Sequence, residues 1–267
     1  MNMKTNIIGN PNGKGIVYDP GLIERLNKKT KGKKPEAKKV ATESPDFSLE
    51  DKTDFYEIKG VHYNNGICRV NLSKTLLPSR TQEEHAEHRM NAKPNEFYLA
   101  DMSLYHSLFT ELFNNKDNSY KPQIEDARQF IKKSMLEHWL TTLTRVHYNP
   151  NGNDMIIHNY GQKDRRKDNL NTFICPNGEI TKISNAEKQL QLLLNTDQNV
   201  NEINSVYNWI TDFNAYLWRL SSRPEKTDER VARLVASSDL VYLLCNWGPS
   251  DLVGGFGVEI FPQEIKV

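Results

Sequence analysis

Two histidines one helical turn apart, His85 and His88, come nearest to a metal site in this chain of 267 residues. They lie in the polar segment 81–90, and Glu84 and Glu87 stand directly before them. Imidazoles at i and i+3 can bind zinc from one side of a helix, but zinc requires further ligands, and none follows at a recognisable spacing. We therefore predict a solvent-exposed polar helix at 81–90 and no metal.

Cysteine chemistry is not indicated either. Cys68, Cys175 and Cys245 are far apart in the sequence and odd in number, which fits neither a disulfide framework nor a CxxC zinc site. We predict that they are buried as small apolar side chains. The sequence also contains no GxSxG, no HExxH and no glycine-rich phosphate loop. These observations favour a protein that is not an enzyme and that needs no cofactor.

The charge pattern argues against a nucleic-acid partner. Lysine and arginine total 35 and aspartate and glutamate total 34, so no net field attracts phosphate. Basic runs at 28–39 and 163–167 are the only support for a nucleic-acid-binding module, and no aromatic residue interleaves with the lysines of the first run. We expect a solvated linker at 28–39, whereas steeply salt-dependent binding would favour the nucleic-acid alternative.

Residues 1–10 and the apolar runs of the sequence indicate where in the cell the chain is expected to be synthesised. Residues 1–10 lack the apolar core of a secretory signal, and no apolar run approaches the roughly 20 residues that span a bilayer. We therefore expect synthesis in the cytoplasm without membrane insertion, and export by another route stays open.

Periodicity and turn signals predict an α+β fold with antiparallel sheets. Asn64-Asn65-Gly66 predicts a tight hairpin. The expected strands are 55–59, 67–72, 143–148, 155–160, 173–175, 180–183, 216–220, 230–236, 240–246 and 256–261. The expected helices are 81–90, one capped by Asp101 or Ser103, one opened by Pro122, 187–194 and 200–214. In the third of these, we expect an apolar stripe that ends on Leu136 and Trp139 to face the core.

The segment 230–247 carries the most information about function. A strand alternates its faces with a period of two residues, and neither face of this segment is wholly polar. The expected inward side chains are Ala236, Ser238, Leu243 and Cys245. The expected outward side chains are Val235, Ser237, Asp239, Tyr242, Leu244 and Asn246. Either both faces are buried, as in a central strand, or an apolar patch is exposed that can bind a protein.

The residues that follow, Trp-Gly-Pro-Ser-Asp-Leu-Val-Gly-Gly-Phe-Gly-Val at 247–258, resemble the C-terminus of the variable proteins of diversity-generating retroelements. The wider stretch 230–258 resembles archaeal members of this group. The family has a C-type-lectin fold, and a reverse transcriptase rewrites its C-terminal coding segment from a template repeat in which adenines are randomised. Glu259 departs from the pattern, since such proteins often have Arg after Gly-Val.

The resemblance implies a division between fixed and diversified positions. The framework positions are Ala236, Ser238, Leu243, Cys245, Pro249, Gly257 and Val258. The diversified, ligand-binding positions are Val235, Ser237, Asp239, Leu240, Val241, Tyr242, Leu244, Asn246, Trp247, Gly248, Asp251, Leu252, Val253 and Gly254. Randomisation is tolerable only where side chains do not set the core, because buried changes commonly cost about 2–5 kcal/mol.

We therefore expect a poorly structured basic extension at 1–52 and a C-type-lectin-like domain at 53–267, with a helical insertion around 185–214. In such a fold the strand at 67–72 pairs near the strand at 256–261. The expected partner is a macromolecule, in the first place a protein, and the oligomeric state stays open. The calcium-binding triplets of sugar-binding lectins do not occur. A relative of the formylglycine-generating enzymes is the remaining enzymatic alternative, although the reactive cysteine pair of that group is absent.

Overall fold

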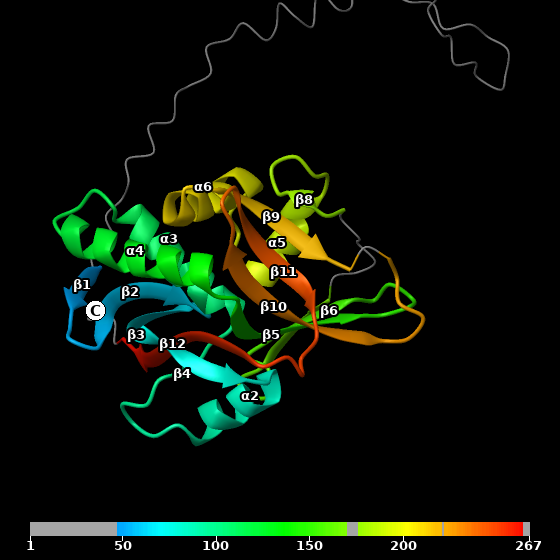
Figure 1. The fold of residues 1–267 in the computed structure, drawn as a ribbon, viewed down its shortest axis with the longest axis horizontal. Helices are drawn as coiled ribbons and strands as arrows, with labels where there is room; N and C mark the ends of the chain where they lie inside the picture. Colours follow the sequence, from blue (N-terminus) through cyan, green and yellow to red (C-terminus); the bar gives the residue numbers. More distant parts are fainter. Residues whose placement is uncertain (1–46, 170–175, 221, 264–267) are drawn as a thin grey trace, which may run out of the picture. The chain divides into compact units, whose positions relative to one another are not determined.

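Two β-sheets and five helices make up the described part of the chain, residues 47–169, 176–220 and 222–263 of a computed structural model (Figure 1). All of these residues belong to one compact unit, Ala41–Val267. The α+β class that the sequence indicates is confirmed. None of the helices in the described ranges is long and apolar enough to cross a lipid bilayer.

The first sheet joins the two ends of the described chain. Its strands, in spatial order, are β1 (Ser48–Asp51), β2 (Phe55–Tyr63), β3 (Gly66–Arg80), β12 (Val253–Pro262) and β4 (Tyr98–Leu99). Asn64 and Asn65 have φ angles of 50° and 63°, the left-handed backbone that a two-residue hairpin turn requires, so the hairpin prediction is confirmed. The pairing of 67–72 with 256–261 is confirmed as well, because Leu72 lies opposite Val258 and Arg69 opposite Phe261.

The second sheet carries the C-terminal strands. Its order is β7 (Arg166–Asn169), β6 (Met155–His158), β5 (Leu140–Tyr148), β10 (Asp228–Ala236), β11 (Leu240–Trp247), β9 (Asn214–Arg219) and β8 (Gly178–Glu179). All neighbours are antiparallel except β9 and β11, which run parallel. The strand expected at 180–183 is wrong, since the backbone N–H groups of Lys182 and Ile183 turn back to the carbonyl oxygen of Glu179. The strand expected at 173–175 lies outside the described residues.

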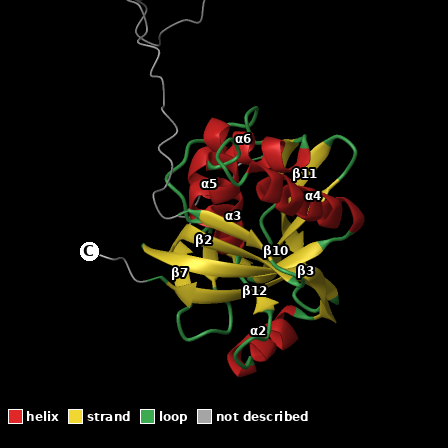
Figure 2. Ribbon diagram, turned by 90° about the vertical axis from the view of Figure 1, so that its left-hand side faces the viewer, coloured by secondary structure: helices red, strands yellow, loops and turns green. Residues whose placement is uncertain are grey.

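Four helices lie on one side of the strands and one on the other (Figure 2). Helices α3 (Met102–Asn114), α4 (Lys121–Glu137), α5 (Ala186–Leu194) and α6 (Val200–Thr211) form the first group, and α2 (Gln82–Asn91) lies alone. Asp101 caps α3 by accepting a hydrogen bond from the N–H of Leu104 at 2.9 Å, and Pro122 stands in the first turn of α4. α4 packs on β10, and α6 packs on β9 and β11.

The prediction of a solvent-exposed helix at 81–90 is wrong for one side of α2. His85 is buried, and its Nε2 atom contacts the carbonyl oxygen of Val253 at 2.9 Å. His88 pairs with Glu96 at 3.0 Å. Within the described residues, no group of three or more His, Cys, Asp or Glu side chains is placed to hold a metal ion. α2 therefore supports the segment that enters β12.

One further sequence expectation changes, at the N-terminal end of the described chain. Residues 48–51, expected in the N-terminal extension, form β1, because Phe47 and Leu49 are apolar and enter the core. The rest of that extension lies outside the described residues. Cys68 and Cys245 are buried, as predicted, and Cys175 is not among the described residues.

Candidate ligand-binding face

The last strands of the second sheet bury one face and present the other. On β11 the inward side chains Val241, Leu243 and Cys245 are fully buried, and Tyr242 between them is only partly buried. This is the period-two alternation that the sequence predicts. The outer face of β11 is thus the place where a variable segment could display side chains without disturbing the core.

Two rows of side chains cross this outer face from strand to strand. In the first row, Tyr242 lies between Val235 of β10 and Tyr216 of β9. In the second row, Leu244 lies between Arg233 of β10 and Trp218 of β9. The ring centroid of Tyr242 lies 5.4 Å from that of Tyr216 and 6.1 Å from that of Trp218, a spacing typical of interacting aromatic rings.

The end of α4 completes the apolar surface. Leu136 is 41% exposed, Trp139 is 47% exposed and Trp218 is 43% exposed, which is unusual for such large apolar side chains. Together they border a cavity of about 350 Å³ between α4 and the sheet. Its lining residues are Leu136, Glu137, His138, Trp139, Trp218, Val235, Ala236, Ser237, Tyr242 and Leu244. We call the outer surface formed by Leu136, Trp139, Tyr216, Trp218, Val235, Tyr242 and Leu244 the aromatic face.

The loop between β11 and β12, residues 248–252, borders the aromatic face. Trp247 precedes it and packs edge-on against Trp139, with ring centroids 4.6 Å apart. The Arg233 guanidinium lies over the Trp247 ring and donates to the carbonyl oxygen of Gly248 at 3.1 Å and to Asp251 at 3.2 Å. Burial lowers the pKa of Arg233 and the Asp251 carboxylate opposes this shift. Arg233 therefore anchors the loop from beneath.

The same loop is also held from the side of α2. The N–H of Gln82 donates to the carbonyl oxygen of Pro249 at 3.1 Å, and the His85 contact to Val253 lies one strand position beyond the loop. Pro249 is partly buried, in line with its assignment to the framework. With anchors at both ends, the loop presents Leu252 to solvent with 65% of the side chain exposed.

Replacing Arg233 by Met removes the anchor and keeps an unbranched side chain of similar length. We expect the amide hydrogens of residues 248–252 to exchange about tenfold faster or more, because local opening then breaks fewer contacts. Amides of β3 and β12 beyond Phe256 serve as the internal control and should not change. Unchanged exchange in the loop would show that α2 alone holds it.

Most of the predicted ligand-binding positions lie at the surface. Those that are partly or fully exposed are Val235, Ser237, Asp239, Leu240, Tyr242, Asn246, Trp247, Gly248, Asp251, Leu252, Val253 and Gly254. Val241 and Leu244 are buried, which contradicts their assignment. Val241 points into the core, whereas Leu244 lies between Arg233 and Trp218 on the outer face and is buried there.

Two more assignments are corrected by the local backbone. Gly254 is partly exposed, but a Cβ atom there would collide with the carbonyl oxygen of Leu77 on β3, so a larger residue requires the backbone to move. Ser238, expected to point inward as framework, is exposed. The N–H of Ser237 donates to the carbonyl oxygen of Leu240 at 2.8 Å, which closes the hairpin, so the alternation of the strand ends at Ala236.

The sequence reasoning missed four residues of the aromatic face. Tyr216 and Trp218 alternate with the buried Ala215 and Leu217 on β9, a signal present in the sequence. Their place beside Tyr242 depends on the parallel pairing of β9 with β11, which local patterns do not reveal. Leu136 and Trp139, the other two, were expected in the core.

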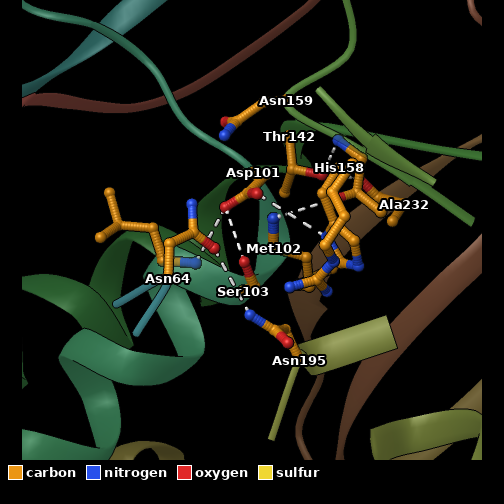
Figure 3. A network of polar contacts seen from close by, with 12 residues as sticks. Asn64, Asp101, Met102, Ser103, Thr142, His158, Asn159, Asn195 and Ala232 are labelled. Carbon is orange, nitrogen blue, oxygen red and sulfur yellow. Dashed lines mark hydrogen bonds and ion pairs between the residues drawn. The ribbon is translucent and has the colours of Figure 1, made fainter. Parts of the chain in front are cut away.

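A buried polar cluster around Asp101 brings together a serine, a histidine and an aspartate (Figure 3). The Ser103 hydroxyl donates to Asp101 at 3.0 Å, and Nδ1 of His158 lies 3.7 Å from the same carboxylate. A hydrolytic triad instead needs the histidine between the serine and the aspartate. Asp101 also accepts from Tyr63 at 3.2 Å and caps α3, so this cluster ties the first sheet, α3 and β6 together.

Comparisons with protein-family models, with curated proteins and with solved structures found no match for this chain.

Proposed function

We propose that this chain is a ligand-binding protein with a C-type-lectin-like fold, a variable protein of a diversity-generating retroelement. Its aromatic face and the 248–252 loop would meet a macromolecular ligand, namely a protein. One observation carries the proposal: on β9, and on β11 from Leu240 to Leu243, buried side chains alternate with side chains on an open apolar surface. This arrangement separates positions that can change from positions that must stay.

The chain topology supports the proposed fold. Strand β3 pairs with the C-terminal strand β12, and the two helices α3 and α4 come after α2 and β4 in the chain. The antiparallel strands β5, β10 and β11 then carry the C-terminal segment. α5 and α6 occupy the place of the helical insertion expected around 185–214.

The chemistry of the face favours a protein ligand. Large contiguous apolar surfaces on a folded protein mark interaction sites, and Trp and Tyr dominate the energetics of protein interfaces. Three of the large exposed apolar side chains, Leu136, Trp139 and Trp218, border one cavity here. The cavity of about 350 Å³ is open at the surface. Trp and Tyr side chains line it, and because these have only two rotatable bonds, they lose little conformational entropy when a ligand binds.

The DNA around the coding region tests the proposed diversification. We expect a second copy of the bases that encode the 235–254 segment, which differs from the coding copy only where the second copy has adenine. An open reading frame for a reverse transcriptase should lie nearby. A genome without such a repeat would refute the retroelement part of the proposal and leave the ligand-binding face to be tested by itself.

The binding role of the face is tested with variants of its rings. Trp218→Ser or Tyr242→Ser should each weaken binding to a protein ligand selected from a displayed library by about 2 kcal/mol or more, a factor of about 30, because buried aromatic anchors carry most interface energy. Met90→Ser is the matched control, since Met90 is 57% exposed but lies on α2. Unchanged affinity of the Trp218→Ser and Tyr242→Ser variants, measured by calorimetry, would show that the selected ligand binds elsewhere.

A further inference from the structure

A polar stripe runs along one side of α3. Ser103, His106, Ser107, Thr110 and Glu111 recur at positions i, i+3, i+4, i+7 and i+8, the spacing of one helix face. Leu104, Leu108 and Phe109 on the other side enter the core. Ser103, His106 and Glu111 are buried even though they are polar. Burial of polar groups costs free energy unless hydrogen-bond partners compensate for the lost water. We therefore ask which partners these buried polar side chains have.

All residues of the stripe except Ser103 line a cavity of about 840 Å³. The cavity is bordered by α3, by the end of β2, and by α5 with the segment that follows it. Its lining residues are His62, Asn65, His106, Ser107, Thr110, Glu111, Lys188, Gln191, Leu192, Asn195, Thr196, Asp197 and Gln198. None of them belongs to the aromatic face, so this cavity is a separate feature of the molecule.

Glu111 is the acidic group of the cavity. Only 7% of the residue is exposed, and burial raises the pKa of its carboxyl to about 7, a shift that the backbone of His62 opposes by hydrogen bonding. Nδ1 of the His62 ring lies 3.6 Å from the carboxylate, but that ring is 55% exposed. The other titratable groups that face Glu111 or line the cavity with it are Cys68, His106, Lys188 and Asp197.

Two residues that line the cavity with Glu111 each have a buried polar atom without a hydrogen-bond partner in the described structure: Nδ1 of His106 and Oγ1 of Thr110. Nε2 of His106 lies 2.9 Å from the side-chain oxygen of Gln198 and therefore donates to it. Nδ1 of the neutral ring is then left as an acceptor. Burial lowers the pKa of His106 to about 4, so the ring is neutral at physiological pH.

We propose that this cavity is a second ligand site, which binds a small organic cation through an ammonium or guanidinium group. The Glu111 carboxylate would accept hydrogen bonds from the N–H donors of the cation, and rotation of the His106 and Thr110 side chains toward the cavity would add the two acceptors that lack a partner. The cation would also place a positive charge next to a buried carboxylate, whose ion-pair partner His62 is 55% exposed. This site does not depend on the proposed display function.

Binding is measured by calorimetry on the whole chain with n-butylammonium and with guanidinium. The controls are 1-butanol, a neutral molecule of the same length, and butyrate, an anion. We expect the cations to bind and the controls not to bind. If n-butylammonium binds and guanidinium does not, the site is specific for an ammonium, and the reverse result assigns it to a guanidinium. Equal binding of 1-butanol and n-butylammonium would overturn the proposal. The absence of binding by both cations would overturn it as well.

The pH dependence adds a second readout. A cation needs the ionised form of Glu111, so its affinity should rise about tenfold between about pH 6 and pH 8. Binding at pH 6 should release a proton, which calorimetry in two buffers of different ionisation enthalpy detects. Glu111→Gln should abolish both the binding and the pH dependence, whereas Lys188→Gln should keep both. A Glu111→Gln chain that still binds n-butylammonium would overturn the proposal.

Folding of the Glu111→Gln variant is not expected to fail. The carboxyl pKa is raised in the folded chain, so ionisation of Glu111 destabilises the fold progressively as the pH rises from about 4.5 to about 7. The amide removes that penalty, and the variant should melt above the parent chain at pH 8 and close to it at pH 4. Thr110→Val is the second test variant, and it should weaken cation binding without any change in the pH profile.

Discussion

Val241→Asn should lower the free energy of unfolding by about 3–5 kcal/mol, whereas Tyr242→Asn, at the next residue, should cost about 1 kcal/mol. Val241 points into the core from β11, and an amide there loses apolar contacts and finds no hydrogen-bond partner among the buried Ala215 and Ala236 beside it. Tyr242 lies on the outer face, where the amide remains in contact with water. Urea denaturation of the two variants at neutral pH measures the difference.

This pair of adjacent substitutions is a direct test of the alternation on which the proposed function rests. The two positions lie in the same strand and hairpin and receive the same side chain, so the low strand propensity of asparagine affects both variants alike. Equal losses at both positions would mean that the outer face is covered as fully as the inner one. In that case β11 would be a central strand buried on both sides, and the ligand-binding proposal would fail.

Asp154→Ala should also cost about 3–5 kcal/mol, because it removes one partner from a buried charge cluster. The Asp154 carboxylate is fully buried and lies 3.4 Å from Arg219 and 3.1 Å from Arg223. It also accepts from the N–H of Asn149 at 2.8 Å. In the variant, the guanidinium of Arg219 at the end of β9 stays buried but loses its ion pair with Asp154. We expect β9, with Tyr216 and Trp218, to become the least protected strand of the sheet.

Asp212→Asn is the control for this substitution, because Asp212 has a left-handed backbone with φ 67° that asparagine adopts more readily than alanine. Asp212 also pairs with two basic residues, Arg128 and Lys132, but its side chain is 55% exposed. Exposed ion pairs contribute about 0–1 kcal/mol, so the control should melt close to the parent chain. Chemical denaturation and hydrogen exchange read out both variants. Similar losses for Asp154 and Asp212 would contradict the role assigned to the buried cluster.

Features encoded locally could be predicted from the sequence. The β2–β3 hairpin follows from Asn64-Asn65-Gly66, since asparagine and glycine adopt the left-handed backbone of the turn at low cost. The start of α3 follows from the capping carboxylate of Asp101, and that of α4 from Pro122. The period-two pattern of β11 placed Leu243 and Cys245 inside and Tyr242 outside.

Features that depend on distant partners could not be predicted in this way. The sequence predicts an apolar stripe on α4 that continues to Trp139, but the helix ends at Glu137 and the backbone of His138 is extended. Whether Leu244 is covered depends on its neighbour Trp218, 26 positions earlier in the chain. The lack of space at Gly254 depends on the carbonyl oxygen of Leu77 in β3.

The parallel pairing of β9 with β11 has a consequence for any family of rewritten copies. Tyr216 and Trp218 precede the 235–254 segment in the chain, yet they form one side of the same surface. Under the proposed rewriting, every copy would keep these two rings, whatever residues the randomised codons of its own 235–254 segment encode. The repertoire would then be biased toward targets that offer an apolar spot at a constant position, with new specificity added beside it.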